Sequence, residues 1–338
     1  DVNDIDIVLD SNNAITGAVT FTTQTGGSNG ADITFDNGTT AISLAGFTTR
    51  GNLTLQTDAA IALTGHTVNG ALAVTSADAI TQSAALTVSG TSSFTSTGSN
   101  DNITLTQANA LTGAVTLTTA GTSGDVSIDN NTTALGIQGT INGGLTVVNG
   151  AAITDSGTLT VSGTSSFTID TGSNHITLGT AALTGAIGVA TSGTSNFTLD
   201  NTTTAVNLGT VGVTGNLSVT SGETITDSGA ITVGGTSSFT TDVNNKAINL
   251  GTTTNAMSGN ITVTTQGTSG DVTIDNGTTA LGIQGTVNGA LDLTAGAAIT
   301  DSGTLTVSGA SDFTIDNGSN HITLGTAALT GAIGVSTT

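Results

Sequence analysis

Exact self-repetition over a long distance is the feature that most constrains how this chain can fold. The segment DSGTLTVSGTSSFTIDTGSNHITLGTAALTGAIGV at 155–189 recurs at 301–335, a shift of 146, with three differences. The segment GDVSIDNNTTALGIQGTINGGL at 124–145 recurs at the same shift, as GDVTIDNGTTALGIQGTVNGAL at 270–291. A fixed period is typical of a repeat array, in which each unit packs only on its neighbours. The chain is therefore expected to be an array, and its function must be one that an array can perform.

Two short boxes reveal a smaller period inside the long one. A G-[TA]-S-x-F-T box recurs at intervals of 73, 72 and 74, and an [LM]-[TS]-G-x-[IV]-x-[VL] box recurs at intervals of 72, 74 and 72. An earlier copy of the second box opens at Ile15, and the interval from Ile15 to Leu111 is 96. Because 96 is one period of 72 plus 24, the spacing predicts a turn of about 24 residues. The box residues are Phe94, Phe167, Phe239 and Phe313, and Leu111, Leu183, Met257 and Leu329.

The local pattern within one period is that of short strands. Apolar residues alternate with Thr, as at Val115 and Leu117 or at Val126 and Ile128, and Gly, Asn, Asp or Ser stand at each end. Three strands of about eight residues make one rung of about 24. The predicted fold is all-β: a right-handed parallel β-helix (β-solenoid) with about 14 rungs. An antiparallel array of hairpins is the structural alternative.

We expect residues 1–338 to form a single continuous solenoid. Residues 1–85 carry more divergent rungs, whereas residues 86–338 follow the regular super-repeat, whose period is 72–74. The absence of Pro suits continuous hydrogen-bonded sheets, because Pro would remove a backbone donor from a central strand.

The charge balance excludes several classes of partner. The chain has 23 acidic residues, and Arg50 and Lys246 are its two basic ones, for a formal net charge of −21. Nucleic acids and anionic lipids are bound by clusters of Lys and Arg, so neither is an expected partner. No run approaches about 18 apolar residues, so membrane insertion is not expected either. Without Cys the chain has no disulfide framework and no thiolate metal site.

Acidic residues beside Asn are the candidates for metal binding. Oxygen-rich turns can bind Ca²⁺, and structural calcium is therefore a possible ligand of this chain. The glycine-rich nonapeptide of calcium-binding β-rolls does not occur, and Asp and Asn also form turns by bonding to their own backbone. The candidate calcium ligands are Asp129, Asp200, Asp275 and Asp316.

No set of residues points to catalysis or to an organic cofactor. His175 and His321 occupy the same repeat position about six rungs apart, or about 29 Å, which is too far to share a metal. His66 is the third histidine. Enzymes that act on acidic sugars generally need Lys or Arg near a substrate carboxylate, and only Arg50 and Lys246 are present. The chain is therefore expected not to be an enzyme.

Exposed Thr-x-Thr rows raise an ice-binding alternative. They occur at 20–22, 116–118 and 262–264 but not in every rung, and β-propensity on a solvent face explains them equally. If the chain instead binds a ligand through a non-repeating patch, the segments 47–50 and 244–246 are where that patch is expected.

The boxes AAITDSGTLTVSGTSSFT at 151–168 and HITLGTAALTGAIGV at 175–189 resemble the repeats of giant bacterial surface proteins. These are the filamentous-haemagglutinin-like and autotransporter-like exoproteins, often described as β-strand-repeat proteins. The resemblance covers nearly the whole chain as a repeat pattern. It implies secretion across the outer membrane, a β-helix shaft, and a role in adhesion, matrix or filament formation.

The expected function is that of a non-catalytic structural shaft in an extracellular bacterial surface protein or fibre. Each added rung extends the array while burying the same narrow core. A terminal rung without a cap exposes unpaired strand edges, so the expected partner is another copy, through end-to-end or lateral fibre contacts. The main alternative is an adhesin that recognises surface glycans or proteins, and an ice-binding solenoid and a polysaccharide-degrading β-helix enzyme are two further ones.

Overall fold

A computed structural model describes residues 5–23 and 30–337 and confirms the expected fold class. The chain is a parallel β-solenoid of about 15 turns, and the strand pairings within each unit are parallel. The described residues contain no helix, and so no helix long and apolar enough to cross a membrane. The chain divides into two compact units, residues 1–164 and residues 165–338, which we call unit 1 and unit 2.

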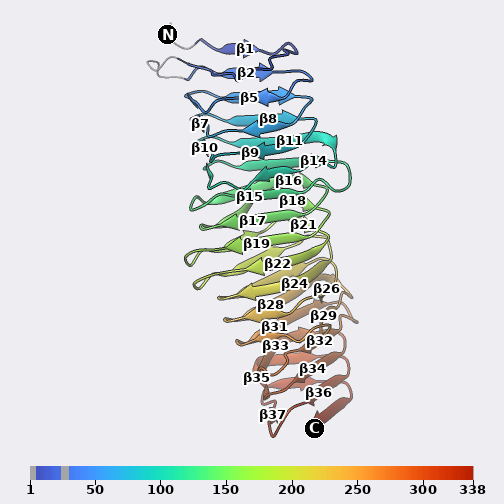
Figure 1. The fold of residues 1–338 in the computed structure, drawn as a ribbon. Coiled ribbons are helices and arrows are strands. Elements are labelled where there is room, and N and C mark those ends of the chain that lie inside the picture. Colours follow the sequence, from blue (N-terminus) through green and yellow to red (C-terminus); the bar gives the residue numbers. More distant parts are fainter. Residues whose placement is uncertain (1–4, 24–29, 338) are drawn as a thin grey trace. The chain divides into compact units, whose positions relative to one another are not determined.

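Strands of unit 1 belong to three sheets, and the third sheet has strands in four of the turns only (Figure 1). The first sheet contains β1 (Ile7–Leu9), β2 (Ile33–Asp36), β5 (Leu53–Thr57), β8 (Leu72–Ser76), β11 (Ser92–Ser99), β14 (Val115–Ala120), β16 (Leu135–Ile141) and β18 (Ile153–Val161). The second sheet contains β3 (Ile42–Ser43), β6 (Ile61–Leu63), β9 (Ile80–Gln82), β12 (Ile103–Leu105), β15 (Val126–Asp129) and β17 (Leu145–Asn149). The third sheet is short and contains β4 (Thr48–Thr49), β7 (Thr67–Val68), β10 (Thr87–Val88) and β13 (Ala110–Leu111).

Unit 2 continues the same pattern with strands of the first and second sheets. The first sheet contains β20 (Ile176–Leu178), β21 (Ala181–Leu183), β23 (Phe197–Asp200), β25 (Leu217–Ser221), β28 (Ser237–Asn244), β31 (Ile261–Gln266), β33 (Leu281–Val287), β35 (Ile299–Val307), β37 (Ile322–Thr323) and β38 (Ala327–Leu329). The second sheet contains β19 (Ser165–Ile169), β22 (Ala186–Ala190), β24 (Val206–Val213), β26 (Ile225–Asp227), β27 (Ile231–Val233), β29 (Ile248–Leu250), β30 (Ala256–Met257), β32 (Val272–Asp275), β34 (Leu291–Ala295), β36 (Ser311–Ile315) and β39 (Ile333–Thr337).

The core of each unit is a narrow column of aliphatic and Phe side chains. Along β25 and β31 every second residue is buried, because successive side chains of a strand point to opposite faces. Inward residues lie directly on those of the next turn; Val219, Phe239 and Val263 follow one another in register. Such stacking removes each apolar side chain from water without needing a wide core, which suits a chain with 2% aromatic residues.

The turn is shorter than the sequence predicted, at about 20 residues. In unit 2, seven successive strand pairings of the second sheet carry the chain through one long period, from β22 to β39. The smaller period inferred from the spacing of the boxes was therefore not one turn. Turn length also varies, because the chain advances by 20 between the paired residues Leu217 and Ser237 and by 24 between Ser237 and Ile261.

The shorter repeat, which separates consecutive boxes, contains three and a half turns. Within unit 2, Phe167 lies in the second sheet, Phe239 in the first, and Phe313 in the second again. Equivalent residues of consecutive repeats thus alternate between two sheets, and only the double repeat of seven turns returns a residue to its own sheet. This alternation explains why the closest sequence identity occurs between every second repeat rather than between neighbouring ones.

Two glycines allow a strand to bulge and continue on the next face of the turn. In β16 and β33 the register shifts before Gly139 and Gly285, whose φ angles are 124° and 122°. A Cβ atom at Gly285 would collide with the carbonyl oxygen of Val263 on the preceding turn. Both the positive φ and this close approach require glycine.

Candidate functional site

A turn with the sequence D-N-x-T-T recurs four times in the described residues. In each copy the Asp carboxylate accepts a hydrogen bond from the backbone N–H two residues further on, at 2.7 or 2.8 Å. The residue that donates has a positive φ in every copy, between 48° and 56°. A carboxylate that closes its own turn in this way forms an Asx turn. The four Asx turns span 36–38, 129–131, 200–202 and 275–277.

Three of the four calcium candidates, Asp129, Asp200 and Asp275, open these turns. Asp316 opens a different turn, in which Gly318 has a φ of 75°. Asp200 ends β23 in the first sheet and Asp275 ends β32 in the second, so the structure does not bring them together. Across residues 5–23 and 30–337, no three or more His, Cys, Asp or Glu side chains are grouped so that they could hold a metal ion.

The Asn of the same box is buried and fully hydrogen bonded. Asn201 Oδ1 accepts a hydrogen bond from the N–H of Leu183, at 2.8 Å. Asn201 Nδ2 donates to the carbonyl oxygens of Leu183, Thr204 and Ala205, at 3.0–3.2 Å. One side chain therefore satisfies backbone groups of two successive turns, where they would otherwise be buried without partners. The equivalent residues are Asn37, Asn130 and Asn276, which make the same four contacts.

Sequence reasoning treated this Asn as an ordinary turn residue and missed its role. One signal was available. The D-N-x-T-T box recurs four times, and the position after its Asn varies among Gly, Asn and Thr. An amide that recurs beside a variable position indicates use of both its donor and its acceptor.

A second repeated carboxylate also joins successive turns. Asp227, which is 3% exposed, accepts hydrogen bonds from the N–H of Thr252 at 3.0 Å, the hydroxyl of Thr253 at 2.9 Å and Nδ2 of Asn255 at 3.0 Å. Its repeat equivalent Asp301 accepts from the N–H groups of Gly325 and Thr326 and from the Thr326 hydroxyl. These hydrogen bonds, first those of the two backbone N–H groups, lower the pKa of Asp301.

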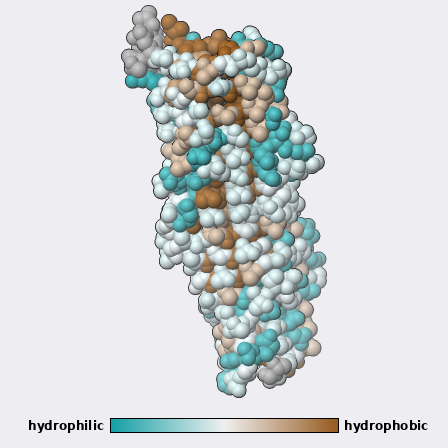
Figure 2. Space-filling model, viewed as in Figure 1, coloured by the Kyte–Doolittle hydropathy of each residue, from teal (hydrophilic) through white to brown (hydrophobic). Residues whose placement is uncertain are grey.

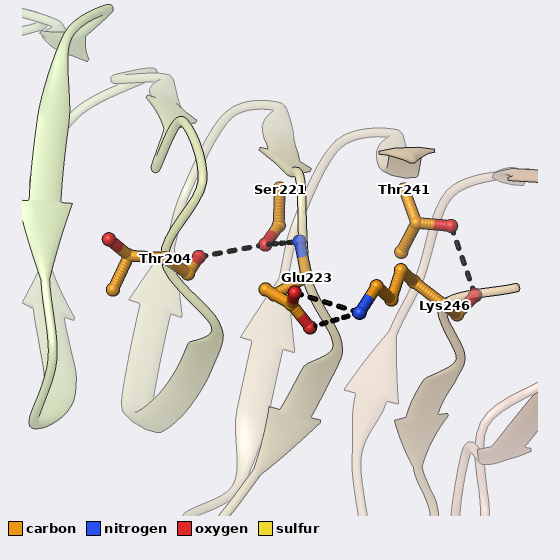
Figure 3. Close-up of polar contacts among 5 residues, drawn as sticks. All are labelled: Thr204, Ser221, Glu223, Thr241 and Lys246. Carbon is orange, nitrogen blue, oxygen red and sulfur yellow. Dashed lines mark hydrogen bonds and ion pairs between the residues drawn. The ribbon is translucent and has the colours of Figure 1, made fainter. Parts of the chain in front are cut away.

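Lys246 lies in one of the two segments where a binding patch was expected, but its charge is already paired. Its Nζ atom contacts both carboxylate oxygens of Glu223 on the preceding turn, at 2.7 Å each (Figure 3). The Lys246 carbonyl oxygen accepts a hydrogen bond from the Thr241 hydroxyl. The Ser221 hydroxyl oxygen accepts a hydrogen bond from the backbone N–H of Glu223. The ion pair therefore links neighbouring turns of unit 2 rather than presenting a free cation.

The other expected patch, 47–50, contains a packed aromatic residue. The Phe47 ring lies edge-on to Phe21, with centroids 5.7 Å apart, and is tilted against the His66 ring, 4.8 Å away. Phe21 is buried and also contacts Phe35. Phe47 therefore belongs to an aromatic cluster at the start of unit 1, in the more divergent part of the chain.

The three histidines have different surroundings. His66 is 1% exposed, and burial lowers its pKa to about 4. Its Nε2 atom lies 3.3 Å from the Thr64 hydroxyl, and its Nδ1 atom has no hydrogen-bond partner among the described residues. His175 Nδ1 accepts a hydrogen bond from the N–H of Asn196, at 3.0 Å. His321 lies seven turns after His175, or about 34 Å away at about 4.8 Å per turn, rather than six.

Threonine rows form registered columns on the first sheet. In unit 2 five threonines from successive strands lie opposite one another, and unit 1 carries a second column of five. Each strand contributes one outward Thr beside an inward apolar residue, as the Thr-x-Thr pattern predicts. The unit 2 column is Thr220, Thr240, Thr264, Thr286 and Thr306, and the unit 1 column is Thr75, Thr95, Thr118, Thr140 and Thr160.

An open groove of about 470 Å³ interrupts the surface of unit 2. Its lining includes Ala190 and Gly212, with Thr191, Thr214 and Thr232 around them. Ala190 and Gly212 face each other in register on β22 and β24. They occupy the repeat positions of Thr264 and Thr286, so the groove lies where two threonines of the equivalent column are replaced by smaller residues.

Comparison with known proteins identifies the repeats but no function. Four consecutive stretches, 50–118, 123–190, 194–264 and 269–336, match the family described as repeats of unknown function (DUF5649). The first match begins at residue 50, inside the segment expected to be divergent. Neither curated proteins nor solved structures gave a match. Since the four repeats cover well over half of the chain, this β-solenoid protein belongs to the DUF5649 repeat family.

Proposed function

We propose that the chain is a non-catalytic structural shaft of an extracellular bacterial surface protein or fibre. The observation that carries the proposal is the use made of its polar side chains. Asn201, Asp227 and Glu223 each bond one turn to the next, and the first two do so again in their repeat equivalents. Repeated carboxylates and amides of this kind hold turns in register, whereas a reaction centre requires unlike groups gathered at one place.

The repeat resemblance to filamentous-haemagglutinin-like and autotransporter-like proteins supports the same proposal and adds the bacterial cell surface as the location. A net charge of −21 favours solubility and opposes nonspecific clumping in such a setting. The partners proposed are further copies of the chain, and surface glycans or proteins. Mechanically, each turn adds length while its core stays the same, so reach is set by the number of repeats.

Lengthening the array tests the shaft directly. A second copy of residues 175–320 inserted after Asn320 reproduces the native junction between Asn174 and His175 and adds seven turns. The expected result in electron micrographs is a particle longer by about 34 Å with unchanged width. A matched insertion of residues 175–309 at the same point breaks the succession of turn types and should give misfolded protein. An unchanged length, or a separate globule, would contradict the proposal.

The groove of unit 2 favours a second candidate function, recognition of a glycan. Its described lining has no charged side chain, and threonine hydroxyls surround small apolar residues, a mixture that suits the hydroxyl and C–H faces of a sugar. The double variant A190T/G212T restores the threonines of the equivalent column and fills the groove. If the chain binds a glycan in an array experiment, this variant should lose that binding, whereas T264A on the other sheet should retain it. Binding unaffected by the filled groove would refute this site.

A further inference from the structure

Asn followed by Gly is a reactive dipeptide, and it recurs along this chain. Glycine has no Cβ atom, so its backbone nitrogen can approach Cγ of the preceding Asn closely and attack it. The attack requires that the glycine nitrogen lose its proton and rotate toward the side chain, which a hydrogen bond from that N–H opposes. Among the described residues the Asn–Gly pairs are 37–38, 69–70, 142–143, 149–150, 276–277, 288–289 and 317–318.

In six of these seven pairs the glycine N–H already donates a hydrogen bond. Two of the six donate to the carboxylate that closes an Asx turn, at 2.8 Å. The other four donate to a backbone carbonyl oxygen of the preceding turn, as Gly70 does to Gly51 at 3.1 Å. These pairs can react only after the turn opens locally. The six donors are Gly38, Gly70, Gly143, Gly150, Gly277 and Gly289.

Asn317–Gly318 is the exception. The pair lies in unit 2, in the loop between β36 and β37 (Figure 1), and both residues are exposed. Within residues 5–23 and 30–337 the Gly318 N–H donates to no acceptor, and the Asn317 side chain makes no hydrogen bond. Asn320 Nδ2 holds the loop by donating to the carbonyl oxygens of Asn317 and Gly296, at 3.0 and 3.1 Å. The loop is therefore anchored while the nitrogen that would attack is free.

Exposure by itself does not single out a reactive Asn. Figure 2 shows hydrophilic residues scattered over the visible face of the molecule rather than gathered in one place. Asn69 is exposed like Asn317, but the N–H of Gly70 is bonded to the turn before it. The free backbone nitrogen at Gly318 is what distinguishes the pair at 317–318 from the pair at 69–70.

The internal copy of this loop shows that its geometry does not depend on the absence of a following turn. Thr171 and Gly172 occupy the same positions between β19 and β20, and Gly172 has a φ angle of 74°, against 75° at Gly318. The next turn is present there, since the Ser192 hydroxyl donates to the Gly172 carbonyl oxygen at 3.0 Å. Thr171 and Gly172 are nevertheless exposed, and among the described residues the Gly172 N–H has no acceptor. The free nitrogen is thus a property of the repeat.

We propose that Asn317 is a site of spontaneous deamidation, which proceeds while the array stays folded. The Gly318 nitrogen bonds to Cγ of Asn317 as the Cγ–Nδ2 bond breaks, and the amide leaves as ammonia with the proton of the glycine nitrogen. Water then opens the cyclic imide at one of its two C–N bonds, which gives Asp or isoaspartate at residue 317. The net reaction consumes one water and releases one ammonia.

The reaction adds one negative charge beside Asp316, because the new carboxyl is ionised at neutral pH. It also makes a chemical difference between two segments of the array that are otherwise nearly identical, since the copy at Thr171 has no amide to lose. This modification goes beyond the proposed shaft function and does not depend on it.

Incubation of the full-length protein in mildly alkaline water labelled with heavy oxygen tests the proposal. After digestion with pepsin, mass spectrometry gives the rate of label uptake at each Asn–Gly pair. Residue 317 should take up label at least about tenfold faster than the other six, because those must first break the glycine hydrogen bond. Asn69 is the closest comparison, since it is also exposed. In the urea-unfolded chain the seven pairs should react at similar rates. Equal rates in the folded protein overturn the proposal, as does a preference for residue 317 that persists after unfolding.

Two substitutions at the same loop position complete the test. The variant N317T copies Thr171 and should abolish label uptake in the peptide that contains residue 317. The reverse variant T171N creates the same D-N-G sequence in the internal copy and should react there at a rate comparable to that of Asn317. Enzymatic methylation of isoaspartate should identify the product at residue 317 in the wild type and at residue 171 as well in T171N. Failure of T171N to react at residue 171 overturns the assignment to the loop geometry.

Discussion

At the residue scale, the chain depends on a few buried polar groups whose hydrogen bonds are complete. Asn201 is the clearest case, since it is 0% exposed and serves two turns at once. A buried amide without partners would destabilise the fold, whereas this one completes the hydrogen bonds of the backbone around it.

Replacing Asn201 should therefore be costly. The variant N201A leaves the backbone groups of Leu183 without their partners, and we expect a loss of about 3 kcal/mol in the free energy of unfolding. Urea unfolding followed by circular dichroism measures it. The control N249T replaces the exposed Asn249 by a Thr between the half-buried Thr226 and Thr273 and should change stability by less than about 0.5 kcal/mol. A similar loss in both variants would show that burial of the amide is not the cause.

His66 should make stability depend on pH. Its pKa is lowered from 6.5 to about 4 on folding, so above pH 6.5 both states are neutral and no penalty exists. As the pH falls from 6.5 towards 4 the unfolded chain takes up a proton that the folded chain excludes, and stability falls by about 3 kcal/mol. Unfolding free energies between pH 4.5 and 7.5 should show this loss in the wild type. The variant H66L places at residue 66 the same residue that stands at the equivalent position of the next turn, Leu86. In this variant the loss of unfolding free energy between pH 6.5 and 4 that is due to His66 should disappear, and identical pH profiles of the two proteins would contradict the assignment.

At the scale of the strand, the bulge and the register decide what each position tolerates. Gly285 holds a conformation that an L side chain rarely adopts, and the preceding turn occupies the space of its Cβ atom. Strands that cross from one face to the next thus depend on a residue with no side chain.

The variant G285A should be strongly destabilised, by about 3 kcal/mol or more, because strain and a backbone clash add together. Gly179 is the matched control, since a Cβ there would meet nothing within 4 Å and its φ is unexceptional. The two unfolding midpoints in urea give the comparison. If G179A loses as much stability as G285A, the bulge geometry is not what requires glycine.

Register also creates one unfavourable pair. Asp292 and Asp312 lie opposite each other on β34 and β36, and partial burial together with the charge of Asp312 raises the pKa of Asp292. The repeat equivalent of Asp312 is Ser166. The variant D312S should add about 0.2–1 kcal/mol at pH 7. It should also shift the Asp292 titration, followed by NMR, to lower pH; an unmoved titration would mean that burial alone raises the pKa.

At the scale of the whole molecule, the half-integral repeat sets the rules for insertion and deletion. Equivalent residues alternate between two sheets of unit 2, so both sheets carry the same inward pattern. A deletion between equivalent positions of two consecutive repeats rotates the following part of the solenoid by half a turn. Inward apolar residues therefore still stack on inward apolar residues.

Deleting one repeat of unit 2 tests this equivalence. Removal of residues 183–256 joins Ala182 to Met257 and should leave a folded solenoid with a similar unfolding midpoint, because every inward position still meets an inward position. Removal of residues 183–246 is out of phase and should yield unfolded or aggregated protein. Circular dichroism and size-exclusion chromatography distinguish the two results, and equal behaviour of both deletions would contradict the equivalence of the sheets.

Much of the fold could be predicted from alternation and period. The two-residue pattern at Val115 and Leu117 determined strands, and the near-identity of 155–189 with 301–335 determined stacking, because both express local geometry repeated along the chain. The site was less accessible. The pattern showed that Asp200 and Asn201 form a turn, but not that Asn201 would be buried against Leu183 on the preceding turn, because that contact depends on the length of the intervening chain.

The amino-acid sequence by itself determined that this protein is an array of short strands repeated with a fixed period, for which a parallel β-helix was the expected fold. Only the tertiary structure decided that a turn contains about 20 residues and that each of the shorter repeats ends half a turn away from its start. The physical reason is that alternation specifies which side chains point inward, whereas turn length is set by how loops, bulges and bridging side chains fit onto the turn below. The period of the sequence gives a number of residues. The way in which one turn stacks on another decides which sheet each of those residues occupies.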